Sequence, residues 1–441
     1  MFLYGFINDQ PIKKMSRKKL IIFMFTVILV GFYSCPGLSF EEKEEIIFKD
    51  YPLEEVVRKL IDKPEGTLYR EDLRNISKFI IPPGTSSLEG IQYLESVKEL
   101  WVIETDIEDF QLISSLEKLE RLYMYYNNID DIKFLARLTN LKELRIQCRS
   151  VGQIRINISP VSNLRNLRSL ELAFLDLGDI TSLANLKSLK HLSLPGNTIK
   201  DLGPLVDLTE LEHLNLFSND IIDVDALLRL TNLKELHLSM NNISDISPLI
   251  NLTELEKLIL YDNKIKNISA IKGMTKLKNL NISANLIEDL SPVSQCNHLI
   301  ILNVAKNLIT SVEPISNLTN LKSLTLALND LNDITPLSSL TRLERVDLNK
   351  TRIRSIEPLT EARRLKELDL SNLAEVDDLY LLRKFPLLER LELCKTRVKD
   401  PSFLIEMLSL KYVDLRGSQA NIEGNEQVNA YIKEYNIKVM Q

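Results

Sequence analysis

Fifteen segments of this chain share one spacing of apolar residues, and most of them begin 22 residues after the previous one. The shared unit reads LxxLxLxxNxIxDIxPLxxLT. Two steps are longer, one of 26 residues and one of 23. A repeat this regular constrains the fold more than any single motif, because each unit must stack on its neighbours. The units begin at Val97, Leu119, Leu141, Leu167, Leu189, Leu211, Leu233, Leu255, Leu277, Leu299, Leu321, Leu343, Leu365, Leu388 and Leu410.

The spacing of the unit predicts its local structure. The alternating LxL predicts a short strand with one buried face. Proline in the DIxPL part fixes φ and favours a tight turn on the opposite side of the unit. A single unit cannot bury its Leu face alone, so the units are expected to stack. We therefore predict an α/β solenoid of about 15 repeats over residues 91–418, with a curved parallel sheet on the concave face and short turns or 3-10 segments on the convex face. Two or three domains, which 441 residues would suggest, are not expected.

An asparagine recurs at the ninth position of the unit. Its amide can satisfy backbone groups in the turn after the strand and join neighbouring repeats. The column is occupied by Asn127, Asn197, Asn219, Asn241, Asn263, Asn285, Asn307 and Asn329. It lapses to Thr351, Leu373, Thr396 and Ser418, so we expect the C-terminal repeats to be less regular.

This unit is the leucine-rich repeat, and its 22-residue DIxPL form resembles that of the bacterial internalins over roughly residues 45–420. The resemblance implies a horseshoe with a helical N-terminal cap, here residues 41–90. Helical spacing over Leu53–Ile61 and the segment REDLRNI predict two helices in that cap. Residues 419–441 predict a closing C-terminal helix around Val428, Tyr431 and Ile432.

The first forty residues indicate export. Arg17, Lys18 and Lys19 precede an apolar run from Leu20 to Tyr33, which is short for a bilayer span and fits a signal segment at 15–35. Residues 1–14 are then an over-extension of the reading frame ahead of Met15. The sequence FYSC resembles a bacterial lipobox, which predicts lipidation of Cys35. Cleavage after GLS with simple secretion, or an uncleaved anchor, are the alternatives.

Composition excludes several classes of function. The net charge of −6 and pI of about 5.6 argue against a nucleic-acid binder. The four cysteines have no metal-ligand spacing. Cys148 and Cys394 lie many repeats apart, too far for a disulfide, and Cys296 occupies a core Leu position. No catalytic motif is present, so we expect no enzyme and no cofactor.

The positions that the core leaves free form the candidate site. Positions three, five, seven and eight of each unit point to or border the concave face, and they collect the only Trp and three of the four His. Such residue types are typical of binding hot spots. We predict a protein- or glycan-binding surface, unless these aromatic rings merely pack on one another. Its residues are Trp101, Tyr123, Tyr125, Tyr126, Arg145, Phe174, His191, His213, Phe217, His237 and Tyr261.

Three further features of this face are open to more than one interpretation. The four-residue insertion in QCRSVGQIRIN is a binding loop or a tolerated insertion. Stacked His191 and His213 can form a pH-sensitive patch near pH 6 or, with Glu235 and His237, bind zinc or copper. The column of Asp347, Asp369, Glu392 and Asp414 either binds a cation or is balanced by flanking Arg345, Arg390, Lys350 and Lys395.

These observations predict a secreted or lipid-anchored bacterial cell-surface protein that binds a protein or glycan partner, for example of a host, through its concave face. No nucleic-acid partner is expected. The alternative is an intracellular regulatory scaffold, because a eukaryotic phosphatase regulatory subunit shares the repeat length. The signal segment favours the first hypothesis.

Overall fold

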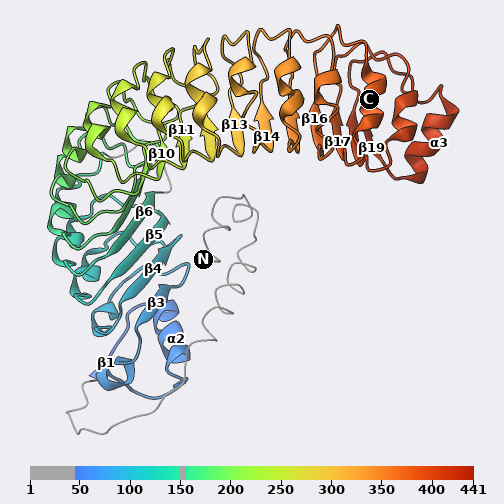
Figure 1. Ribbon diagram of the computed structural model, residues 1–441. Coiled ribbons are helices and arrows are strands. Elements are labelled where there is room, and N and C mark those ends of the chain that lie inside the picture. The colour runs from blue at the N-terminus through green and yellow to red at the C-terminus, as the bar shows by residue number, and fades with distance from the viewer. Residues whose placement is uncertain (1–44, 149–154) are drawn as a thin grey trace. The chain divides into compact units, whose positions relative to one another are not determined.

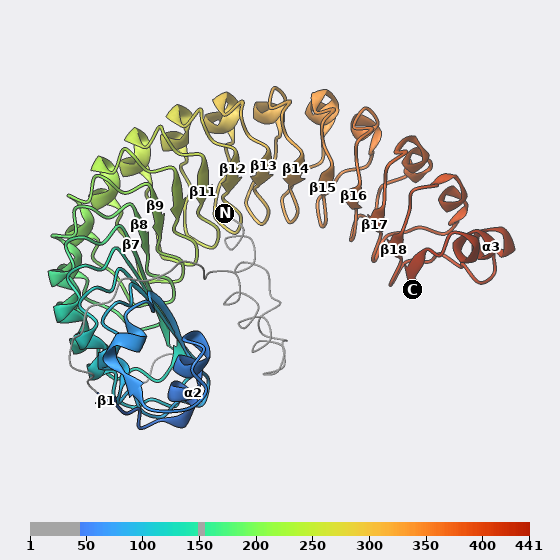
Figure 2. The ribbon, with the colours of Figure 1, turned by 90° about the horizontal axis from the view of Figure 1, so that it is seen from below.

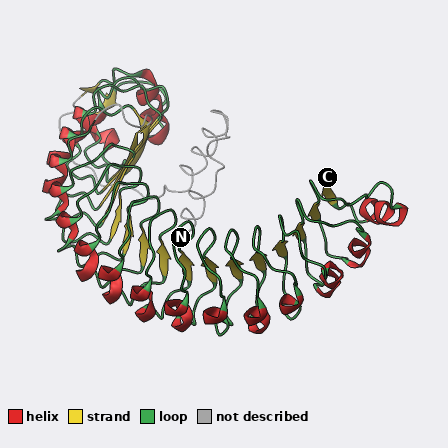
Figure 3. Ribbon diagram, turned by 90° about the horizontal axis from the view of Figure 1, so that it is seen from above, coloured by secondary structure: helices red, strands yellow, loops and turns green. Residues whose placement is uncertain are grey.

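The computed structural model describes residues 45–148 and 155–441. Residues 1–14, the signal segment at 15–35 with Cys35, and most of the insertion in the third repeat lie outside the described residues. Over residues 45–441 the repeats stack into a curved solenoid, as predicted. Its strands line the inner side of the curve and its short 3-10 helices line the outer side (Figures 1, 2 and 3).

Within the described residues, one parallel sheet of 17 strands runs through the solenoid. Its end strand β3 pairs with β4 and its other end strand β19 pairs with β18, so the sheet is open. The strands are β3 (Lys78–Ile81), β4 (Glu99–Ile103), β5 (Arg121–Asn127), β6 (Glu143–Cys148), β7 (Ser169–Ala173), β8 (His191–Ser193), β9 (His213–Asn215), β10 (Glu235–His237), β11 (Lys257–Ile259), β12 (Asn279–Asn281), β13 (Ile301–Asn303), β14 (Ser323–Thr325), β15 (Arg345–Asp347), β16 (Glu367–Asp369), β17 (Arg390–Glu392), β18 (Tyr412–Asp414) and β19 (Lys438–Met440).

Among the described residues, each repeat from Val97 to Leu388 carries one short 3-10 segment on the convex side, three to six residues long, and another such segment precedes the first repeat. In the DIxPL part of the unit, the Asp side chain accepts a hydrogen bond from the backbone two residues on, as Asp245 does from the Ser247 N–H at 2.8 Å. The segments are η3 (Ile91–Tyr93), η4 (Gln111–Ser115), η5 (Lys133–Arg137), η6 (Ser159–Asn163), η7 (Thr181–Leu183), η8 (Gly203–Leu205), η9 (Asp225–Arg229), η10 (Ser247–Asn251), η11 (Ser269–Gly273), η12 (Ser291–Gln295), η13 (Glu313–Ile315), η14 (Thr335–Ser339), η15 (Glu357–Leu359), η16 (Leu379–Lys384) and η17 (Ser402–Glu406).

The core lies between the sheet and these 3-10 segments. In the unit around β10, Leu233, Leu236, Leu238, Ile243 and Ile246 are each at most 1% exposed. Burial of one such side chain stabilises the fold by about 1.5–3 kcal/mol. Because the strands pair in parallel at a fixed register, each repeat position forms a straight column across the sheet. The fold therefore decides which residues of different repeats become neighbours.

The asparagine column forms the ladder that the spacing predicts. The Oδ1 of Asn241 accepts from the Ile221 N–H at 3.0 Å, and its Nδ2 donates to Leu216 O at 3.0 Å and Leu238 O at 2.9 Å. Each such amide thus joins two repeats. Thr351, which replaces Asn in the column, donates only to Leu348 O in its own repeat.

The caps differ from the predicted helices in detail. The first predicted helix is α2 (Tyr51–Leu60), capped by the Asp50 side chain, which accepts from the Leu53 N–H. The second is only a 3-10 turn, η2 (Arg70–Leu73), and the antiparallel pair of β1 (Glu45–Ile46) and β2 (Leu68–Tyr69) accompanies it. The sheet already begins at β3, inside the segment predicted as cap.

At the other end, α3 (Glu426–Glu434) is the predicted closing helix. It is followed by β19, which extends the sheet and which the sequence pattern did not predict. Cys148, Cys296 and Cys394 are free thiols, and Cys296 is fully buried in the core, as its position predicts. Among the residues described, no helix is both long and apolar enough to span a membrane.

Candidate functional site

The concave face carries its largest side chains on the longest strands. Strands β4–β7 have five to seven residues, whereas β8–β19 have three. The parallel register places Trp101, Tyr123 and Arg145 side by side at position five, and Tyr125 follows two residues after Tyr123. We call these four residues the aromatic cluster. The Trp101 ring centroid lies 4.2 Å from that of Tyr123 and 6.3 Å from that of Tyr125, and the Arg145 guanidinium lies 5.7 Å from the Tyr123 ring.

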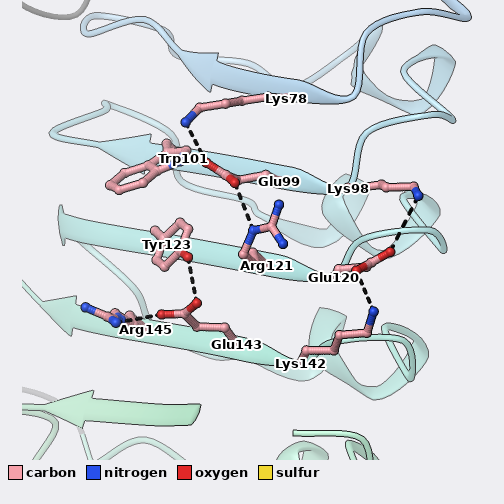
Figure 4. A network of polar contacts seen from close by, with 10 residues as sticks. All are labelled: Lys78, Lys98, Glu99, Trp101, Glu120, Arg121, Tyr123, Lys142, Glu143 and Arg145. Atoms are coloured by element: carbon pink, nitrogen blue, oxygen red, sulfur yellow. Dashed lines mark hydrogen bonds and ion pairs between the residues drawn. The ribbon is translucent and has the colours of Figure 1, made fainter. Parts of the chain in front are cut away.

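A half-buried carboxylate fixes the Trp101 side of this cluster. Glu99 accepts from Trp101 Nε1 at 2.7 Å and from Arg121 Nε at 2.8 Å, and Lys78 Nζ lies 2.6 Å away (Figure 4). Burial opposes ionisation of Glu99, but the hydrogen bonds from Lys78, Trp101 and Arg121 outweigh it and lower the pKa of this carboxyl. Glu99 therefore stays charged and holds three side chains in place.

Glu143 has the same role on the Arg145 side. It accepts from the Tyr123 hydroxyl at 2.8 Å and lies 2.6 Å from Arg145 Nη2 (Figure 4). Burial, and then the charge of Glu171, raise the pKa of Tyr125 to about 12, so its hydroxyl remains protonated. Tyr123 is only 8% exposed, because Trp101 and Arg145 cover its ring. The rings pack on one another, yet Trp101 and Tyr125 remain partly open to solvent.

Tyr126 and Phe174 occupy a different environment from the cluster. Both are at position eight, where the chain takes a left-handed conformation with φ of 58° and 59°. Tyr126 sits at an irregularity in the pairing of β5 with β6, and such a bulge redirects the side chain. The Phe174 ring lies over Gly196, where a Cβ would come within 2.2 Å of it. Tyr126 lies at this bulge near the end of β5, and Phe174 follows the last residue of β7, so both are at the border of the concave face.

A second group of rings lies farther along the sheet. The rings of Phe217 and His237 have centroids 5.3 Å apart, and Tyr261 lies 6.3 Å from Phe217 and 6.2 Å from His237. Burial, with a smaller effect of Lys257, lowers the pKa of His237 to about 4. We call Phe217, His237 and Tyr261 the central cluster. Ser193 and Asn215 stand at position five of β8 and β9, between the central cluster and the aromatic cluster. That all these rings form one binding surface stays a prediction.

His191 and His213 are stacked as their register predicts, with ring centroids 4.5 Å apart and an interplanar angle of 16°. Burial and the neighbouring His213 lower the pKa of His191. His213 Nδ1 lies 3.6 Å from Glu235. With its pKa held at about 4 by burial, His237 is not a switch at pH 6. The pH-sensitive patch at His191 and His213 stays a prediction. Among the described residues, no three His, Cys, Asp or Glu side chains are placed to hold a metal ion.

The acidic column on β15–β18 is only partly balanced by the cations that the sequence suggested. Arg390 pairs with Glu392 at 2.5 Å, whereas Asp414 pairs with Arg416 at 2.6 Å, a residue to which the pattern assigned no role. Burial, opposed by the Asn349 N–H and assisted by the charge of Asp369, raises the pKa of Asp347 to about 6. This region is therefore a polar face whose charge changes with pH.

The pattern missed the residues that organise the aromatic cluster. Glu99 and Glu143 stand at position three, which the repeat places on the concave face, but the pattern assigned these carboxylates no role. The available signal was the column itself, since Lys78, Glu99, Arg121 and Glu143 alternate in charge along paired strands. A column of alternating charge at position three, next to the column of aromatic rings at position five, indicates that the carboxylates hydrogen-bond to the rings and fix their positions.

Comparisons with known proteins support the repeat architecture. The family described as Leucine Rich repeats (2 copies) matches residues 187–229, 209–251 and 253–295. An internalin, InlF of Listeria monocytogenes, is 33% identical over 75% of this chain and 98% of that chain, with a TM-score of 0.70. No curated protein matches the chain by sequence.

Two other solved structures share the fold at lower identity. A leucine-rich-repeat protein of Leptospira interrogans is 20% identical, with 84% of this chain and 97% of that chain covered and a TM-score of 0.73. The plant peptide hormone receptor RGFR1, solved in complex with RGF2, is 18% identical, with 80% and 60% covered and a TM-score of 0.61.

Proposed function

Because this chain belongs to the bacterial internalin-like leucine-rich-repeat proteins, we propose that it is an exported binding protein without catalytic activity. Its partner, a protein, docks on the concave face over the aromatic cluster. The observation that carries this proposal is the network around Trp101, in which Glu99 and Glu143 hold two rings and two guanidinium groups in fixed positions.

A network of this kind suits recognition for an energetic reason. A side chain that must be ordered on binding costs about 0.5–1.5 kcal/mol. Trp101, Tyr123 and Arg145 are already ordered in the free protein by hydrogen bonds and ring contacts. Trp, Tyr and Arg are also the residues most enriched at hot spots of protein interfaces. The cluster therefore offers a preorganised apolar surface with paired charges at its border.

The paired charges favour a protein over a polyanionic partner. Both guanidinium groups at the aromatic cluster face carboxylates. Arg145, within it, faces Glu143 and, at 4.0 Å, Glu171, and Arg121, beside it, faces Glu99. The structure of the plant receptor RGFR1 in complex with RGF2 shows that this architecture supports recognition of a peptide ligand. A glycan remains the second candidate, since ring faces also stack on sugars.

Binding can be tested with the labelled chain on an array of purified extracellular proteins and glycans. We expect selective binding to a protein, and the double variant Trp101→Ala/Tyr125→Ala should weaken it by about tenfold or more. Tyr123 is left unchanged because it is nearly buried, so that replacing it would disturb folding as well as binding. The control is Tyr380→Ala, an exposed Tyr of η16 on the convex side. Equal binding by wild type and the double variant would exclude the aromatic cluster as the site.

Export and anchoring are a separate part of the proposal. The basic and apolar segment at 15–35 supports export, and Cys35 supports a lipid anchor. Expressed in a bacterium with labelled palmitate, the wild-type chain should carry the label and sediment with membranes, and Cys35→Ala should carry none. An unlabelled chain found in the medium would show that the protein is secreted without a lipid anchor. A cytosolic chain that retains residues 15–35 would contradict export.

A further inference from the structure

One edge of the sheet, where the strands begin, carries a column of alternating charge at position two of the repeats. In this column a glutamate forms ion pairs with the lysines of the preceding and the following repeat. Glu120 lies 3.6 Å from Lys98 and 2.6 Å from Lys142, and Glu212 lies 2.8 Å from Lys190 and 2.5 Å from Lys234. The hydrogen bonds from the two lysines lower the pKa of Glu212 to about 2. Alternation thus neutralises this edge along much of the solenoid.

Arg168 breaks the alternation with a cation where the pattern requires an anion. Its N–H donates to Lys142 O at 2.8 Å, and the Lys190 N–H donates to Arg168 O at 2.9 Å, so three cationic residues are direct neighbours. The side chains of Lys142 and Lys190 turn to carboxylates on their far sides, Glu120 and Glu212. Among the described residues, the exposed Arg168 side chain has no acidic partner. Like charges at this spacing repel, so the arrangement has a cost that a bound anion would remove.

The surface beside Arg168 is hollowed. A cavity of about 520 Å³ is lined by four cationic side chains, Lys98, Lys118, Lys142 and Arg168, against the single carboxylate of Glu120. The local charge is therefore +3 on a chain whose net charge is −6. Lys98, Glu120 and Lys142 lie at the strand starts, away from Trp101 and Tyr123 (Figure 4). This cavity is a separate surface from the aromatic cluster.

The remaining lining groups indicate what kind of anion fits. Asn140, Asn166 and Ser188 are exposed amides and a hydroxyl. The Nδ2 groups of Asn140 and Asn166 donate to the backbone oxygens of Glu117 and Thr139. Their Oδ1 atoms accept no hydrogen bond from the described residues and are available as acceptors for hydroxyl groups. The residues described as lining this cavity include no aromatic ring, so bases of a nucleic acid would find nothing on which to stack.

We propose that this cavity binds a sulfated polysaccharide, with Arg168 as the central sulfate-binding residue. The guanidinium presents a planar fork of donors that matches an oxyanion, and Lys118 and Lys142, which also line the cavity, supply further point charges. Sugar hydroxyls meet the Asn140 and Asn166 oxygens. The site gives the protein a second attachment to acidic glycans, on a face that leaves the concave surface free.

The test uses the full-length chain and heparin as the probe. Wild type should be retained on immobilised heparin, and salt should elute it because salt screens ionic contacts. Arg168→Glu should elute at a lower salt concentration, and its affinity for heparin should fall by about tenfold or more. Arg168→Lys should keep part of the affinity. Lys278→Glu is the matched control, because it makes the same charge change at position two of a repeat remote from the cavity.

Several outcomes would overturn the assignment. An equal loss of retention in Lys278→Glu and Arg168→Glu would show unspecific attraction, and wild type that passes heparin unretained would show no site. If single-stranded DNA binds as tightly as heparin at the same salt concentration, the ligand of this cavity is a nucleic acid and not a polysaccharide. The Trp101→Ala/Tyr125→Ala variant should bind heparin as wild type does, which separates this site from the concave one.

Discussion

At the scale of single residues, position in the repeat sets the ionisation of a side chain. His237 stands at position five of β10, where Phe217 and Tyr261 cover its ring. Its Nε2 is buried and, within the described part of the chain, has no hydrogen-bond partner. Burial lowers the pKa to about 4, against about 6.5 for an unfolded histidine. The folded protein therefore keeps His237 neutral where the unfolded chain takes up a proton.

This difference predicts a specific pH dependence of stability. Above pH 6.5 both states are neutral at His237, and stability is lost as the pH falls from about 6.5 toward 4. Between pH 7 and pH 5, the unfolding free energy of wild type should fall by about 1 kcal/mol more than that of His237→Gln. This value already includes a reduction for partial solvent screening. Urea unfolding at both pH values measures it. His298→Gln, at an exposed position, should change with pH as wild type does. An unchanged pH response in His237→Gln would contradict the burial argument.

At the scale of elements, the repeat predicted the features that recur in every unit and missed those that occur once, at the ends of the solenoid. Strands, 3-10 turns and the Asn241 ladder follow from the spacing, because each depends on contacts that recur at a fixed distance in the chain. The strand β19 did not follow, because only its pairing with β18 makes it a strand. The second predicted cap helix is only the turn η2, whose start is capped by Asp72 accepting from the Tyr69 N–H.

The candidate site shows the same division. Register places Trp101 beside Tyr123, and it stacks His191 on His213, as the repeat length requires. The depth of burial could not be read from the pattern, because it depends on which side chains cover a ring. Tyr123 is nearly buried for that reason, while Phe174 at position eight turns away over Gly196.

At the scale of the whole molecule, the ladder divides the solenoid into unequal parts. From Asn197 to Asn329 each ladder amide bonds the preceding repeat. Thr351 and Thr396 bond only their own repeats. Because a solenoid is held by interfaces between nearest neighbours, each missing amide weakens one interface. A lost hydrogen bond is worth about 0.5–1.5 kcal/mol.

We therefore expect the repeats after Thr351 to open below the free energy of global unfolding, so that amides of β16–β18 exchange about tenfold faster than those of β9–β13. Hydrogen exchange followed by mass spectrometry measures both segments in one sample. Thr351→Asn should slow exchange around β15, because its amide can reach the Leu331 N–H as Asn329 reaches the Ile309 N–H at 3.1 Å. Thr351→Ser, which keeps the hydroxyl and adds no amide, should have no such effect. Uniform exchange across both segments would mean that core packing, and not the ladder, sets the stability of each interface.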